Sequence, residues 1–164
     1  KNGFTYGASS SFVFRRGQGP FVIGTSVRTD VTAPAVTEIF REVDRMREGE
    51  VTAEELATAK DSIARSLPGM FETTPESASS IGQLFVHNLP LDYYHNLPEQ
   101  IQSVSAADVQ RVAQQYLKPE ETVIVAVGDR AKIEPELAKL DLGPIEIRDS
   151  AGKIGDVPPV HLVS

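Results

Sequence analysis

The sequence predicts an α+β domain in which a layer of helices packs on a largely antiparallel sheet. Residues 4–15 alternate between apolar and polar side chains and are followed, after a short turn, by a β-rich run over residues 21–28, which predicts an antiparallel hairpin. Residues 122–127 are apolar on both alternations, the pattern of a strand covered on both faces. Helical patterns occupy the region between them. Strands, then helices, then a strand is the order of an α+β structure rather than of a doubly wound sheet.

Each helix in this region has a local signal. From Thr32 the apolar side chains recur at helical spacing, which predicts a helix ending near Gly49. Thr52 and Glu55 have the spacing of a capping box and predict the start of a second helix, which Pro68 interrupts. The remaining predicted elements are a helix over 76–88, a short element over 92–97, a helix that begins with a cap at Ser105, a helix over 130–140 and an edge strand over 145–147.

The length of 164 residues is typical of one domain. We expect this domain to span residues 1–148 and to be followed by a loosely ordered tail over 149–164, which is rich in glycine and proline. The first residues resemble neither a start methionine nor a signal peptide, so the chain is expected to be a fragment of a longer protein.

Composition and charge exclude several classes of function. The net charge of −7 repels phosphate backbones, so nucleic acid is not an expected partner. Without cysteine the chain has no disulfide, thiolate nucleophile or cysteine-ligated metal. The longest aliphatic run covers residues 123–127, far short of the roughly 18 residues of a membrane span, so none is expected.

The histidines do not have the spacing of a metal site. His87 and His95 are eight residues apart and lack the His-x-x-Glu-His arrangement of zinc peptidase helices, while His161 lies in the predicted tail. We therefore expect this chain to hold no metal. Arg15 and Arg16, near the hairpin turn, have two interpretations: a solvated loop or a contact with an acidic partner.

Tyr6 is the candidate catalytic residue. It lies in the first predicted strand between Gly3 and Gly7, which permit close approach of another backbone, and a phenol can donate a hydrogen bond to a developing oxyanion. The alternative is an ordinary core tyrosine, because Tyr6 shares its predicted strand face with Phe4 and Phe12.

An ordered set of short segments resembles the second, metal-free domain of the insulinase or pitrilysin (M16) family of zinc peptidases. The similarity is to short bacterial members and to relatives of the mitochondrial processing peptidase, and it runs from about residue 3 to residue 149. The segments are Gly3-Phe4-Thr5-Tyr6-Gly7-Ala8-Ser9-Ser10, Gly24-Thr25-Ser26-Val27, residues 51–60, Leu89-Pro90-Leu91-Asp92-Tyr93-Tyr94 and Leu97-Pro98.

The resemblance implies that the two domains of such a peptidase have different catalytic roles. In this family two similar domains close around an unfolded peptide; one carries zinc on a His-x-x-Glu-His helix, and the other contributes an arginine and a tyrosine that are separated by six residues. Gly3 and Tyr6 match that second pattern. The arginine would fall two positions before Lys1, and the opening strand and helix of the domain are not in this sequence. Tyr6 is therefore expected to assist a zinc site on another domain or subunit, and this chain alone, which binds no cofactor, is expected to be inactive.

These expectations define the chain as the non-catalytic half of a zinc metalloendopeptidase, with the zinc-bearing half and an unfolded peptide substrate as partners. The alternative is a non-enzymatic structural or peptide-binding protein that keeps the same fold. The zinc-bearing half belongs either to the same polypeptide or to a separate subunit. The bacterial character of the resemblance favours a periplasmic location, with the cytoplasm as the alternative.

Overall fold

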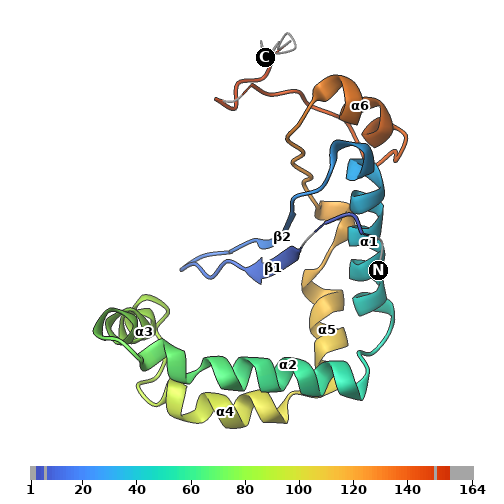
Figure 1. The fold of residues 1–164 in the computed structure, drawn as a ribbon. Coiled ribbons are helices and arrows are strands. Elements are labelled where there is room, and N and C mark those ends of the chain that lie inside the picture. The colour runs from blue at the N-terminus through green and yellow to red at the C-terminus, as the bar shows by residue number, and fades with distance from the viewer. Residues whose placement is uncertain (1–2, 6, 150, 156–164) are drawn as a thin grey trace. The chain divides into compact units, whose positions relative to one another are not determined.

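Two short strands near the start of the chain form a hairpin. The computed structural model describes residues 3–5, 7–149 and 151–155. Strands β1 (Ala8–Phe12) and β2 (Phe21–Thr25) pair in a two-stranded sheet, in which they run in opposite directions (Figure 1). The predicted hairpin is therefore confirmed, with shorter strands. Alternation between apolar and polar residues is typical of a half-buried strand, but β1 is exposed at every position, whereas in β2 Phe21, Ile23 and Thr25 are half-buried.

The chain divides into two compact units, each formed by segments that are separate in the sequence. The first unit comprises residues 1–10, 23–41 and 120–164, and the second comprises residues 11–22 and 42–119.

In the first unit a short 3₁₀ turn packs on a helix from the other end of the chain. The turn η1 (Thr29–Val31) leads into α1 (Thr32–Glu48), which continues into the second unit, and it contacts α6 (Arg130–Ala138). The apolar side chains buried in this unit are Ala33, Ala35 and Ile133. The helices predicted over 32–49 and 130–140 are both present.

Besides the tip of the hairpin and the last residues of α1, the second unit contains four helices and a 3₁₀ turn. These elements are α2 (Ala53–Ser66), η2 (Pro68–Phe71), α3 (Thr74–Val86), α4 (Tyr93–Ser103) and α5 (Ala106–Tyr116). Helix α2 contacts α4, and η2 contacts both α2 and α3. The predicted interruption at Pro68 is confirmed, since α2 ends just before it.

Polar contacts hold these helices together. The Tyr94 hydroxyl of α4 donates to the carbonyl oxygen of Ser80 in α3 at 3.0 Å, and the Ser80 hydroxyl donates to the carbonyl oxygen of Met70 in η2 at 2.9 Å. Lys60 of α2 donates to the carbonyl oxygen of Gln102 in α4 at 2.7 Å. The packing of α3 and α4 thus depends on hydrogen bonds as well as on apolar burial.

Three capping boxes begin α2, α3 and α5. At α2 the Thr52 hydroxyl accepts from the backbone N–H of Glu55 at 3.1 Å, and the Glu55 carboxylate accepts from the Thr52 N–H at 2.9 Å. Thr73 with Glu76 and Ser105 with Asp108 repeat this arrangement. The predicted caps at Thr52 and Ser105 are therefore confirmed.

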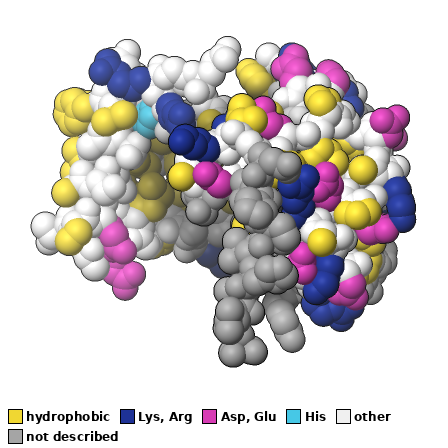
Figure 2. Space-filling model, turned by 90° about the horizontal axis from the view of Figure 1, so that it is seen from above, with side chains coloured by type: hydrophobic (Ala, Val, Ile, Leu, Met, Phe, Trp, Pro, Cys, Tyr) yellow, Lys and Arg dark blue, Asp and Glu magenta, His cyan; other side chains and the backbone are white. Residues whose placement is uncertain are grey.

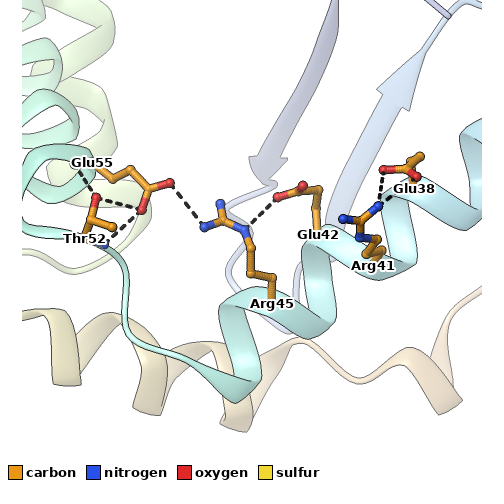
Figure 3. A network of polar contacts seen from close by, with 6 residues as sticks. All are labelled: Glu38, Arg41, Glu42, Arg45, Thr52 and Glu55. Carbon is orange, nitrogen blue, oxygen red and sulfur yellow. Dashed lines mark hydrogen bonds and ion pairs between the residues drawn. The ribbon is translucent and has the colours of Figure 1, made fainter. Parts of the chain in front are cut away.

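The same carboxylate connects α1 to α2. Arg45 of α1 donates to Glu55 at 3.2 Å and to Glu42 at 2.9 Å, and Arg41 pairs with Glu38 one turn earlier (Figure 3). The Thr52 N–H and hydroxyl hold the pKa of the Glu55 carboxyl below its usual range, and Arg45 lowers it further.

Two predicted strands are not formed. Residues 122–127 are not a strand, and within them Val123, Val125 and Val127 are 83%, 82% and 96% exposed. A strand needs a neighbour for its backbone hydrogen bonds, and β1 and β2 are the strands of the described residues. Residues 145–147 also form no strand, although Arg148 and Ile154 close an isolated antiparallel bridge.

The internal core is small. Among the described residues the buried apolar side chains are Ala33, Ala35, Leu84, Ala113, Leu117 and Ile133. None of the larger side chains described is fully removed from solvent. Helices together with a small antiparallel sheet nevertheless confirm the predicted α+β class. Within the part of the chain that the structure describes, no helix is both long and apolar enough to cross a bilayer.

Candidate functional site

The candidate residue Tyr6 lies outside the described residues, but its neighbours are described. The Thr5 hydroxyl donates to the carbonyl oxygen of Gly7 at 2.7 Å. From the end of β2, the Thr25 hydroxyl lies 3.0 Å from both the Thr5 hydroxyl and the Gly7 carbonyl oxygen. The residues on either side of position 6 are thus bonded to the second strand of the hairpin.

Of the two glycines in this segment, Gly3 but not Gly7 has a backbone conformation that favours glycine. Gly3 has a φ of +63°, in the left-handed region that favours glycine. A Cβ atom at Gly3 or at Gly7 would meet no atom within 4 Å. Packing against the described residues therefore does not require either glycine.

The serines of β1 have no activating group among their contacts. Ser9, Ser10 and Ser11 are exposed, and the Ser9 hydroxyl donates to the carbonyl oxygen of Gly24 across the hairpin at 3.4 Å. This contact is typical of serines on the surface of a sheet. A nucleophilic serine would need a neighbouring base within hydrogen-bond reach.

Within residues 3–5, 7–149 and 151–155, no three His, Cys, Asp or Glu side chains form a group that could hold a metal ion. His87, at the end of α3, lies edge-on to the ring of Phe14 with centroids 6.4 Å apart, and His95 is exposed on α4. His161 lies outside the described residues.

A depression of about 670 Å³ lies in the first unit between η1, the start of α1 and α6. Its charged side chains have partners nearby: Asp30 pairs with Arg28, Lys132 with Asp129 and Glu136 with Lys139. The hydrogen bond from Arg28 also lowers the pKa of Asp30. Because its charges are already compensated, this depression offers no free charge to a ligand. Its lining residues are Thr29, Asp30, Thr32, Ala33, Lys132, Ile133 and Glu136.

Comparison with known proteins gives a consistent result for sequence and fold. Residues 1–63 match the model of the family described as the peptidase M16 inactive domain. The structure is similar to a crystal structure of a peptidase M16 inactive domain from Pseudomonas fluorescens, with a TM-score of 0.65 and 24% sequence identity. That alignment covers 72% of this chain and 28% of the Pseudomonas chain. A search of curated proteins gave no significant match.

Proposed function

Since residues 1–63 match the model of the peptidase M16 inactive-domain family, and the chain has the fold of such a domain, we propose that it is the non-catalytic half of a zinc metalloendopeptidase. The agreement between the family match and the fold carries this proposal. The chain spans 28% of the length of the Pseudomonas protein that it resembles in fold. The zinc-bearing companion half and the unfolded peptide substrate belong to the proposal.

In the proposed assembly the companion half holds zinc, which polarises the scissile carbonyl and lowers the pKa of a bound water. This chain contributes Tyr6, whose phenol donates a hydrogen bond to the oxygen on which negative charge develops. The contacts of the Thr25 hydroxyl with the Thr5 hydroxyl and with the Gly7 carbonyl oxygen support this role, because they connect the residues on either side of position 6 to β2.

The small core supports the need for a companion. Large apolar side chains are exposed in residues 122–127, although this segment has the composition of a buried strand. Exposed apolar surface of this kind marks places where a protein contacts another chain or domain. A companion half that covers such surface would stabilise the fold as well as complete the active site.

The test is the substitution Tyr6→Phe in the complete assembly, with peptide hydrolysis as the readout. Loss of one oxyanion donor typically lowers kcat by about 10²–10³-fold, and we expect a loss of that order with unchanged zinc content and an unchanged far-UV circular dichroism spectrum. Tyr116→Phe is the matched control, because Tyr116 is 60% exposed on α5. We expect this control to retain wild-type turnover.

Wild-type turnover of Tyr6→Phe would remove this residue from the mechanism. If the complete assembly also hydrolysed no peptide in the presence of zinc, the proposal of a peptidase would be wrong. The non-enzymatic alternative, a protein that keeps the fold and binds peptides, would then be favoured.

A further inference from the structure

The tip of the hairpin has a defined conformation. The Val13 N–H donates to the carbonyl oxygen of Pro20 at 2.9 Å, which closes the loop between the strands. A Cβ atom at Gly19 would lie 1.7 Å from the carbonyl oxygen of Val13, so no side chain fits there. Next to this closure the rings of Phe12 and Phe21 pack with centroids 4.7 Å apart. The side chains between Val13 and Gly19 are therefore presented by a constrained loop.

This loop presents an aromatic side chain to solvent. Phe14 is 81% exposed, and its ring contacts His87 after the C-terminal end of α3. Figure 2 shows a face on which hydrophobic and basic side chains lie beside a histidine. We name the set Phe14, Arg15, Arg16 and His87 the tip surface; all four residues belong to the second unit.

Arg15 and Arg16 differ from every other arginine of the chain. The other eight form ion pairs with carboxylates. Arg15 and Arg16 are exposed, and neither pairs with a carboxylate of the described residues. This absence of a described carboxylate beside Arg15 and Arg16 contrasts with the composition, because the chain has more acidic than basic residues. Two adjacent arginines without a carboxylate partner among the described residues therefore follow the exposed Phe14 in the loop. The paired arginines are Arg28, Arg41, Arg45, Arg47, Arg65, Arg111, Arg130 and Arg148.

We propose that the tip surface is a docking site for an acidic segment of a partner protein. A hydrophobic side chain of the segment packs on the exposed ring of Phe14, and its carboxylates pair with Arg15 and Arg16. Guanidinium groups match carboxylates in geometry, and aromatic side chains with arginine are enriched at the centres of protein interfaces.

The net charge of the chain favours a protein rather than a nucleic acid as the partner of the tip surface. Two arginines on a chain with a net charge of −7 do not make the basic stripe that a phosphate backbone requires. A short acidic segment with an apolar anchor needs only the local charge and the exposed ring. The proposal does not depend on the peptidase assignment, since the tip surface contains neither Tyr6 nor a zinc ligand.

The test measures binding of a fluorescent peptide to the full chain by anisotropy. The probe carries glutamates on both sides of one phenylalanine, and the comparison peptide carries glutamines in their place. We expect the double variant Arg15→Gln/Arg16→Gln to bind the acidic probe about tenfold more weakly than the wild type, and added salt to weaken wild-type binding. We also expect Phe14→Ala to weaken binding without changing its salt dependence.

Arg65→Gln/Arg111→Gln is the matched control. It removes the same charge from two exposed arginines of the second unit that lie outside the tip surface. We expect it to bind the probe as the wild type does. Circular dichroism checks that each variant keeps its helices.

Equal weakening by both double variants would overturn the proposal, because net charge alone would then explain binding. Equal affinity for the glutamine peptide would overturn it as well. Preference for a single-stranded oligonucleotide over the acidic probe would assign the surface to nucleic acid instead.

Discussion

The Thr52 hydroxyl at the start of α2 provides a quantitative test of how this helix is stabilised. No residue of α2 is buried, so its 14 residues depend strongly on the capping box and on contacts with α4. Thr52→Ala removes the acceptor for the Glu55 N–H and the hydroxyl that donates to the Glu55 carboxylate at 3.0 Å. Loss of such a cap typically costs about 1 kcal/mol, within a range of about 0.5–2 kcal/mol.

The assay is urea unfolding followed by far-UV circular dichroism. We expect Thr52→Ala to lower the unfolding midpoint, and Thr52→Ser to restore most of it because serine caps equally well. Thr58→Ala is the matched control: the same change in the exposed middle of α2 replaces a weaker helix former by alanine and is expected to stabilise by a few tenths of a kcal/mol. Equal shifts for Thr52→Ala and Thr58→Ala would refute the capping argument.

Two further predictions concern packing and pH. Leu84 is 5% exposed, whereas Leu91 is 80% exposed. In the same unfolding assay we expect Leu84→Ala to destabilise the chain by about 2 kcal/mol or more and Leu91→Ala by less than about 0.5 kcal/mol. Similar values for both variants would contradict the observed packing of Leu84. Hydrogen bonds from Thr52 lower the pKa of the Glu55 carboxyl below its ordinary value of 4.5. Hydrogen bonds from Ser105 likewise lower the pKa of the Asp108 carboxyl below its ordinary value of 3.8. The unfolded chain therefore binds protons more readily than the folded chain as the pH falls. The contribution of both carboxylates to the free energy of unfolding is complete above about pH 4.5 and is lost as the pH falls through their lowered pKa values, so the melting temperature is expected to fall on acidification. A melting temperature that rises between pH 5 and pH 3 would contradict this direction.

The elements with strong local signals could be predicted from the sequence. The capping residues at Thr52 and Ser105 are found where the pattern places them, because a cap requires residues only three positions apart. The hairpin and the helix from Thr32 also follow from periodicity over neighbouring residues.

Elements that depend on distant partners were not predictable in the same way. Residues 122–127 have a strand pattern, but the pattern does not supply the neighbouring strand. Helix α4 extends to Ser103 instead of ending near Leu97, and Pro98 lies within it. Tertiary contacts made by Tyr94 and by the carbonyl of Gln102 favour the longer helix, whereas the local signal of proline is to break it.

The candidate site shows the same limit. The role of Tyr6 follows from the family resemblance, because its strand pattern alone also fits a core tyrosine. It stays a prediction, since the structure describes Thr5 and Gly7 but not this residue. For Arg15 and Arg16 the sequence left two interpretations open, because it does not show which arginines find a carboxylate in the folded chain.

The central claim is that this chain completes a zinc peptidase whose metal lies on another half. The most direct measurement is zinc content and hydrolysis of an unfolded peptide for the chain alone, for the companion half alone and for the two together. The account predicts zinc in the companion half and in the assembly, and rapid hydrolysis by the assembly alone. Tight zinc binding with hydrolysis by the isolated chain, or full turnover by the companion half without it, would contradict the claim.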